Sequence, residues 1–327
     1  MQKDNVLSVE DLSVTIKGDK RSVVPVQGVS FTIPKGKVVG MVGESGCGKS
    51  MTARSIMGLL PKGGFISSGR ILFGGEEISS YTEKQMLAIN GKRISMIFQE
   101  PMSSLNPVMK VGKQVEEVLR LHTDMNRAAA KKAVVDIFAQ VGIPEPEQRY
   151  NAYPFQLSGG LRQRVMIAMA MVCNPELLIA DEPTTALDVT IEAQILRLMR
   201  NLQREYGTSI LMITHNLGVV AKICDQVNVM YLGQIVESCD TAALFAHPMH
   251  PYTKGLIASV PRIGQEEQRL SGIRGTVPPL NDLPTGCRFS TRCPYATDRC
   301  RQEAPPLTEL EAGHSVRCFF PREEGQV

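Results

Sequence analysis

A glycine-rich string between residues 43 and 50 is the most informative chemical pattern in the chain. It fits G-x-x-x-x-G-K-S at every fixed position, with an apolar run before it and a helical pattern after it. Glycines let backbone N–H groups turn toward phosphate oxygens, and the start of the following helix adds further donors. Lys49 is expected to reach the β- and γ-phosphates of a nucleoside triphosphate, and the Ser50 hydroxyl is expected to bind Mg²⁺. The predicted nucleotide-binding residues of this phosphate loop are Gly43, Glu44, Ser45, Gly46, Cys47, Gly48, Lys49 and Ser50.

Two acidic residues follow a second apolar run, Leu177–Ala180. Asp181, at the predicted end of a buried strand, is expected to hold Mg²⁺ through a water molecule. Glu182 comes next and is expected to polarise the attacking water as a general base. Taken alone, either residue would also suit an acidic cap before the turn at Pro183. The phosphate loop makes that alternative a minor one.

The elements that must position these residues alternate between strands and helices. Short β-branched runs predict half-buried strands at 7–16 and 29–33, and continuous apolar runs predict buried parallel strands. The predicted buried strands are Val38–Val42, Leu177–Ala180 and Ile210–Ile213, and Ile191–Tyr206 has a helical pattern. Alternation of this kind is typical of an α/β fold with a largely parallel sheet.

The chain is expected to divide into a nucleotide-binding domain at 1–247 and an extension at 248–327. From about 98 to 172 the pattern is mostly helical, which predicts a helical subdomain inserted between strands of the core. Ten of the 20 prolines lie from Pro248 onward. We therefore expect the extension to be rich in loops and not to continue the sheet.

Composition excludes several classes of protein. The 327 residues are 43% hydrophobic and 21% charged, as in ordinary globular proteins. A net charge of +3 gives little attraction for nucleic acid, so none is expected as a partner. Residues Met1–Glu10 lack the apolar core of a secretory signal, and the apolar run Val165–Cys173 is too short to span a membrane.

The string Leu157–Arg164, read with the phosphate loop, resembles the signature of the ATP-binding-cassette (ABC) ATPases. The resemblance implies a P-loop fold with an N-terminal antiparallel β-subdomain, and ATP hydrolysis with Mg²⁺. It also implies that Ser158, Gly159 and Gly160 begin a helix that binds ATP held by a partner subunit, which suits an anion site at a helix start. Three more positions resemble family motifs: Gln99 a Mg²⁺-sensing glutamine, Ala186-Leu187-Asp188 the D-loop, and His215 the switch histidine at the γ-phosphate.

Two positions depart from the family pattern. Ile16 and Lys17 stand where an aromatic residue usually stacks on adenine, so apolar packing is expected to hold the base. Asn216 follows His215 where an acid is common, and we expect this change to be tolerated.

The strings Phe98–Pro107 and His250–Thr253 narrow the resemblance to the peptide and nickel importer branch. This implies an ATPase at the cytoplasmic face of the membrane that drives transport of dipeptides or oligopeptides. The implied partners are a second, similar ATPase subunit, two transmembrane permease subunits and, indirectly, an extracytoplasmic substrate-binding protein. Nickel or another small solute is the alternative cargo, and a soluble ABC ATPase without a transporter is the alternative class.

Four of the eight cysteines crowd into the extension, at Cys287, Cys293, Cys300 and Cys318. In a cytosolic chain such clustering favours a metal site, which would organise a segment with little apolar surface. The resemblance implies a 4Fe-4S cluster on these four residues. Zinc stays an alternative although the spacing is not C-x-x-C, and His314 could replace one ligand. Free thiols and disulfides formed after isolation are the remaining alternatives.

The phosphate loop and the signature occur once each in the chain. We expect that a compact domain cannot fold one onto the other. Two chains are therefore expected to pair head to tail, each lending Ser158–Gly160 to the other's ATP. The expected natural pair is a heterodimer with the related subunit.

Overall fold

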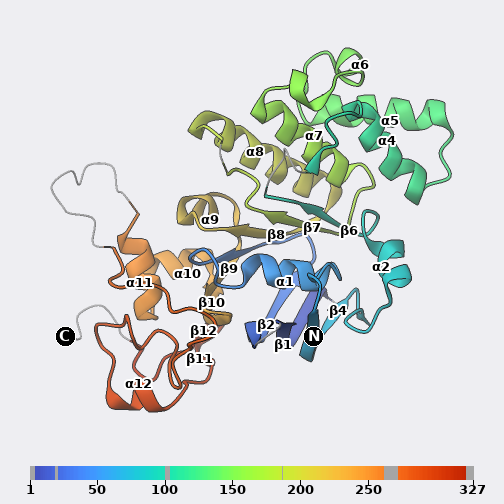
Figure 1. Cartoon of the computed structure of the whole chain (residues 1–327). Helices are drawn as coiled ribbons and strands as arrows, with labels where there is room; N and C mark the ends of the chain where they lie inside the picture. Colours follow the sequence, from blue (N-terminus) through green and yellow to red (C-terminus); the bar gives the residue numbers. More distant parts are fainter. Residues whose placement is uncertain (1–3, 19–20, 100–103, 186, 261–271, 322–327) are drawn as a thin grey trace. The chain divides into compact units, whose positions relative to one another are not determined.

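The computed structural model describes the chain apart from residues 1–3, 19–20, 100–103, 186, 261–271 and 322–327 (Figure 1). It divides into two compact units. The first unit comprises residues 1–6, 33–37 and 80–212, and the second comprises 7–32, 38–79 and 213–327. The second unit thus runs unbroken across the boundary predicted at residue 247. In the described part of the chain, no helix combines the length and the apolar character that a bilayer crossing requires.

The first unit contains buried strands and the helix that follows them. Strands β6 (Ile94–Ile97) and β7 (Leu177–Asp181) are parallel, and β8 (Ser209–Thr214) lies next to β7. Helix α8 (Val189–Tyr206) begins where the Asp188 carboxylate accepts the Ile191 N–H at 2.9 Å. It ends at Gly207, whose positive φ of 67° terminates the helix in the way glycine favours. The strands and the helix predicted in this region are confirmed.

Helices fill the stretch of the first unit between β6 and β7 in the sequence. They are α4 (Val111–His122), α5 (Arg127–Gln140), α6 (Pro146–Arg149), the 3₁₀ helix η2 (Pro154–Gln156) and α7 (Gly159–Met171). Helix α4 packs against α5 and α7. The buried Glu116 carboxylate of α4 accepts hydrogen bonds from Tyr150 and Lys113. A short helix, α2 (Glu83–Ile89), precedes β6 and begins with a capping box between Thr82 and Gln85.

The second unit contains an antiparallel sheet of order β2-β1-β4-β5. Its strands are β2 (Ser22–Pro34), β1 (Asn5–Lys17), β4 (Gly64–Phe73) and β5 (Glu76–Glu77). The β1–β4 register shifts after Glu10, and there a Cβ on Gly69 would lie 2.4 Å from the backbone of Asp11. Only glycine fits that close approach. The predicted antiparallel β-subdomain is confirmed, and β2 is much longer than the predicted 29–33.

A second group of strands in this unit has the order β11-β12-β10-β9-β3. Strand β3 (Val38–Val42) is parallel to β9 (Gln226–Tyr231), whereas β10 (Gln234–Asp240), β12 (His314–Val316) and β11 (Thr308–Glu311) continue antiparallel. The expectation that the extension does not continue the sheet was therefore wrong. Strands β11 and β12 have only four and three residues, too few for an alternating pattern to emerge, and β12 pairs with β10, which is distant in sequence.

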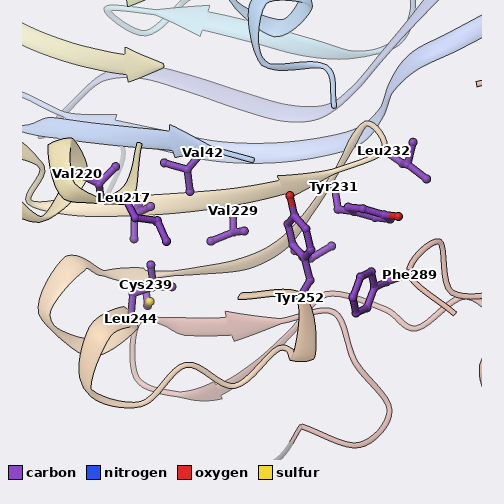
Figure 2. Close-up of a cluster of buried hydrophobic side chains, with 12 residues drawn as sticks. Val42, Leu217, Val220, Val229, Tyr231, Leu232, Cys239, Leu244, Tyr252 and Phe289 are labelled. Carbon is purple, nitrogen blue, oxygen red and sulfur yellow. The ribbon is translucent and has the colours of Figure 1, made fainter. Parts of the chain in front are cut away.

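The helices of the second unit complete its core (Figure 2). They are α1 (Lys49–Ile56), α9 (Leu217–Ile223), α10 (Thr241–Ala246), α11 (Pro251–Ala258) and α12 (Asp298–Gln302). One buried cluster joins Val42 of β3, Val229 and Tyr231 of β9, Tyr252 of α11 and Phe289 of the extension. The extension therefore shares a core with β3 and β9. The expectation that it has too little apolar surface to fold tightly by itself stays a prediction.

Candidate functional site

The phosphate loop leaves β3 at Gly43 and enters α1 at Gly48. A Cβ on Gly43 would lie 2.2 Å from the Met230 carbonyl oxygen, and one on Gly48 would lie 2.5 Å from that of Pro25. Gly48 also caps α1 with a φ of 105°. The loop therefore passes so close to neighbouring backbone that only glycine fits at both ends.

Lys49 lies folded into this loop, with 5% of its surface exposed. Its ammonium group donates hydrogen bonds to the carbonyl oxygens of Gly43, at 2.8 Å, and Glu44, at 3.0 Å. Ser50 follows in the first turn of α1, and Ser45 and Gly46 form the exposed crest of the loop. A cation, a helix start and an exposed glycine turn together offer the donors that a polyphosphate requires.

Cys47 contributes to the loop by packing. Its side chain is 2% exposed, and its sulfur lies 3.6 Å from the Lys49 ammonium. Burial raises the pKa of the Cys47 thiol even though the nearby Lys49 opposes the shift. The thiol is therefore protonated at neutral pH, and its side chain is shielded from the surface.

In the first unit, the structure brings Gln99 and Glu182 together. The Gln99 amide donates to Oε2 of Glu182 at 3.1 Å, and the Thr185 hydroxyl donates to the same oxygen at 2.8 Å. Glu182 has a positive φ of 48°, which costs free energy for a residue with a side chain and recurs at active sites. Asp181 is buried at the end of β7. Of the string that follows Gln99, residues 100–103 lie outside the described residues.

The signature residues also lie in the first unit, at the start of α7. The Ser158 hydroxyl caps the helix by accepting the Leu161 N–H at 3.4 Å, and Ser158 and Gly159 are exposed. A Cβ on Gly160 would lie 3.0 Å from the Ile191 side chain of α8. The predicted helix start is confirmed. Asp188 caps α8 as described above, and Ala186 of the D-loop string lies outside the described residues.

His215 belongs to the second unit, where it is exposed directly after β8. The next residue, Asn216, has a structural role in helix α9. The Asn216 side chain accepts the Gly218 N–H at 2.9 Å and caps α9. Asparagine is as good a helix cap as aspartate, which is consistent with the expectation that it is tolerated at this position.

The predicted residues are thus divided between the two units. The phosphate loop and His215 lie in the second, and the others lie in the first: Gln99, Asp181, Glu182, Asp188 and Ser158–Gly160.

An aromatic residue that the sequence did not reveal lies beside the predicted adenine position. Phe65 of β4 is paired with Thr15 of β1, and Gly64 is paired with Ile16. The Lys17 ammonium lies 5.1 Å from the centroid of the Phe65 ring, which is 39% exposed. The strand pairing, which a sequence pattern does not contain, brings the ring there.

All four predicted cysteines line one cavity in the second unit, together with Phe289. Burial and then its cysteine neighbours raise the pKa of Cys287, and burial above all raises the pKa of Cys318 to about 11. All four are free thiols, and the Cys300 sulfur lies 3.4 Å from the Thr297 hydroxyl. A metal that binds here must therefore displace protons.

His314 does not line this cavity, so it is not placed to replace a cysteine. Its Nε2 lies 2.8 Å from Oε1 of Glu237, which also accepts the Met249 N–H, while Oε2 accepts the His250 N–H at 3.0 Å. The donor atoms of Glu237, Cys239 and His314 lie within 4.8 Å of one another. Burial raises the pKa of the Cys239 thiol to about 12. With both carboxylate oxygens engaged and the thiol protonated, this group braces β12 and the start of α11 against β10.

Two sequence families match the chain. The pattern described as ABC transporter matches residues 26–185, and the pattern described as oligopeptide/dipeptide transporter, C-terminal region, matches residues 236–300. The oligopeptide transport ATP-binding protein AppD of Bacillus subtilis (strain 168) is 50% identical over 98% of this chain and 98% of its own length. The dipeptide transport ATP-binding protein DppD of Escherichia coli (strain K12) is 44% identical over the same shares.

Solved structures of single cassettes share the fold. One is the dimeric ATP-binding cassette MJ0796 bound to ADP and Pi, with a TM-score of 0.65 and 24% identity over 72% of this chain and 98% of that one. Another is cbiO1 from Clostridium perfringens, with a TM-score of 0.64 and 29% identity over 74% of this chain and 91% of that one. These two structures therefore match about three quarters of this chain.

Proposed function

This chain belongs to the ABC transporter ATP-binding proteins of the oligopeptide/dipeptide branch, and from that premise we propose that it powers a bacterial importer of dipeptides or oligopeptides. The observation that carries the proposal is the extent of the similarity. Relatives that are named for oligopeptide and dipeptide transport match 98% of the chain, including the extension. The enzymatic activity is hydrolysis of ATP to ADP and phosphate.

The phosphate loop is proposed to bind the ATP phosphates. Its exposed crest offers backbone N–H groups, and the Lys49 ammonium is already held in the loop by the carbonyl oxygens of Gly43 and Glu44. On binding, the ammonium group exchanges its carbonyl partners for β- and γ-phosphate oxygens, and Ser50 binds Mg²⁺. The exchange replaces neutral acceptors with charged ones, which strengthens each hydrogen bond.

Glu182 is proposed to be the general base for the attacking water. The two hydrogen bonds from Gln99 and Thr185 hold its carboxylate in one orientation, which supports this role. Gln99 and Asp181 are the further proposed Mg²⁺ residues, and His215 is proposed to contact the γ-phosphate.

Assembly with a second ATPase subunit is part of the proposal. Ser158 and Gly159 are exposed at the start of a 13-residue helix, which suits binding of another chain's ATP. The dimeric state of MJ0796 is consistent with such pairing. The complete transporter is proposed to add two permease subunits and an external binding protein, with this chain peripheral at the cytoplasmic face.

A 4Fe-4S cluster is proposed for the four cysteines. Four thiols around one cavity match its ligand number. A lone zinc ion with bonds of about 2.3 Å would require sulfurs about 3.8 Å apart. Within the described residues, the group with three donors mutually within 4.8 Å is Glu237, Cys239 and His314, and it does not include the four cysteines. The cluster would supply four strong bonds that order the extension, and no redox step is assigned to it.

The proposed function is tested by reconstituting the chain with its partner ATPase and permeases in vesicles. We expect ATP hydrolysis and uptake of labelled dipeptides or oligopeptides, both lost in Lys49→Ala. Stimulation by nickel without any response to peptides would assign the other cargo. ATPase activity that is full without permeases and indifferent to all solutes would refute a transport role.

A further inference from the structure

The phosphate loop is tied to the C-terminal extension by a two-pronged ion pair. Both terminal nitrogens of Arg292 reach the Glu44 carboxylate, at 2.6 and 3.1 Å. The Arg292 side chain is 4% exposed, and that of Glu44 is 30% exposed. Because the geometry is bidentate and largely shielded from water, this pair differs from the solvent-exposed ion pairs that contribute little.

Arg292 is itself held in place from several sides. Its Nε donates to the Arg274 carbonyl oxygen at 3.1 Å, and one terminal nitrogen lies 3.4 Å from the Tyr231 hydroxyl. The guanidinium carbon lies 5.8 Å from the centroid of the Tyr231 ring. A guanidinium group keeps its positive charge at physiological pH, so Arg292 is a permanent cation. The Arg292 guanidinium therefore has a fixed position, and the phosphate loop is held to it through the Glu44 carboxylate.

A second contact fixes the main chain of the same loop residue. The Glu44 N–H donates to the Tyr252 hydroxyl at 2.9 Å. Tyr252 is fully buried, and its ring packs at 4.7 Å from Tyr231 and 5.4 Å from Phe289 (Figure 2). Phe289 in turn lines the cysteine cavity. The side chain and the backbone of Glu44 are thus both held by residues of the extension.

Glu44 connects these contacts to Lys49, because its carbonyl oxygen accepts a hydrogen bond from the Lys49 ammonium. Its carboxylate also lies in a loop that is proposed to receive several negative phosphate charges. An unpaired carboxylate there would repel them, since like charges a few ångströms apart repel each other more strongly near a protein surface than in bulk water. Arg292 therefore both positions the loop and cancels that charge.

We propose that Arg292 and Tyr252 are positioning residues of the phosphate loop, through which the extension sets the affinity for ATP. This inference rests on the proposed phosphate-binding role of Gly43–Ser50. Both residues lie outside the segment that matches the ABC transporter family pattern, residues 26–185. Arg292 also precedes Cys293 directly, so a change in the cysteine cavity reaches the loop through one peptide bond.

The test measures the Kd of Mg-ATP for the full-length chain by calorimetry, with the thermal midpoint as a check of folding. Arg292→Gln is expected to weaken binding about tenfold, because the Glu44 carboxylate loses its countercharge. Adding Glu44→Gln removes that charge and is expected to restore most of the affinity. Tyr252→Phe, which removes the acceptor of the Glu44 N–H, is expected to weaken binding about threefold.

The matched control is Arg301→Gln in the same extension, whose pair with Asp298 is exposed. It is expected to leave the Kd unchanged. Wild-type affinity in Arg292→Gln, or no recovery in the double variant, would overturn the inference. If Arg292→Gln unfolds, Arg292→Lys replaces it in the comparison, because lysine keeps the positive charge. The loss of affinity in Arg292→Lys alone should then be smaller than the loss in Arg292→Lys combined with Tyr252→Phe. Unchanged binding in Lys49→Ala would instead remove the phosphate-loop role itself.

Discussion

Replacing Glu182 with glutamine separates the chemistry of the proposed base from its placement. Gln99 and Thr185 both donate a hydrogen bond to Oε2 of Glu182. A glutamine oxygen accepts the same two hydrogen bonds, so the side chain keeps its position while losing its ability to take a proton. General-base catalysis contributes about 10²- to 10⁴-fold. The expected loss is therefore about 2.7 to 5.4 kcal/mol in the activation free energy of hydrolysis.

The assay is single-turnover ATP hydrolysis in the assembled transporter, with the partner ATPase inactivated at its own phosphate-loop lysine so that its site does not mask the result. Mg-ATP binding should be unchanged, because the phosphate loop is untouched. Thr185→Val is the matched control, since it removes one hydrogen bond and leaves the base. Hydrolysis by Glu182→Gln within a few-fold of the wild-type rate would refute the assignment of Glu182 as base.

Three further outcomes are expected. Burial lowers the pKa of His250 to about 4 from its ordinary 6.5. The folding stability that the neutral side chain contributes is therefore full above pH 6.5 and is lost as the pH falls toward 4, a loss on the order of 3 kcal/mol. Thermal midpoints that do not drop over this pH range would contradict the prediction. Protein purified without oxygen should be brown with about four irons per chain, and Cys300→Ser should bleach it; a colourless protein with one zinc would exclude the cluster. Ser158→Arg should leave ATP binding by the isolated chain intact and abolish hydrolysis in the assembled pair, and undiminished turnover of that pair would argue against signature exchange.

The parts of the fold that the sequence predicted are those with a strong local signal. Val38–Val42 is buried at every position, so its apolar run identified the strand with correct bounds. Ser158 was recognisable as a helix start because serine before a helix is a local rule. Strand β2 was underpredicted because Pro25 and Gly28, with a positive φ of 59°, interrupt its pattern while cross-strand pairing sustains it.

The parts that the sequence missed depend on contacts between distant residues. Phe65 reaches the predicted adenine position through strand pairing, and β12 forms by pairing with β10 and β11. The pair of Arg292 with Glu44 has no periodic pattern and joins residues 248 positions apart. The placement of side chains so far apart in sequence depends on the packing of the assembled core, in which Tyr252 and Phe289 are in contact. Local sequence preferences do not predict it.

The long separation between Glu44 and Arg292 has a consequence for synthesis on the ribosome. The phosphate loop emerges from the ribosome first, whereas the arginine that secures it emerges 248 residues later. Chains are made from the N-terminus and domains fold as their residues appear. The nucleotide loop of the nascent cassette is therefore unbraced until that arginine has been made. A chain released before that point would carry every residue of the loop without the ion pair proposed to set its affinity for ATP.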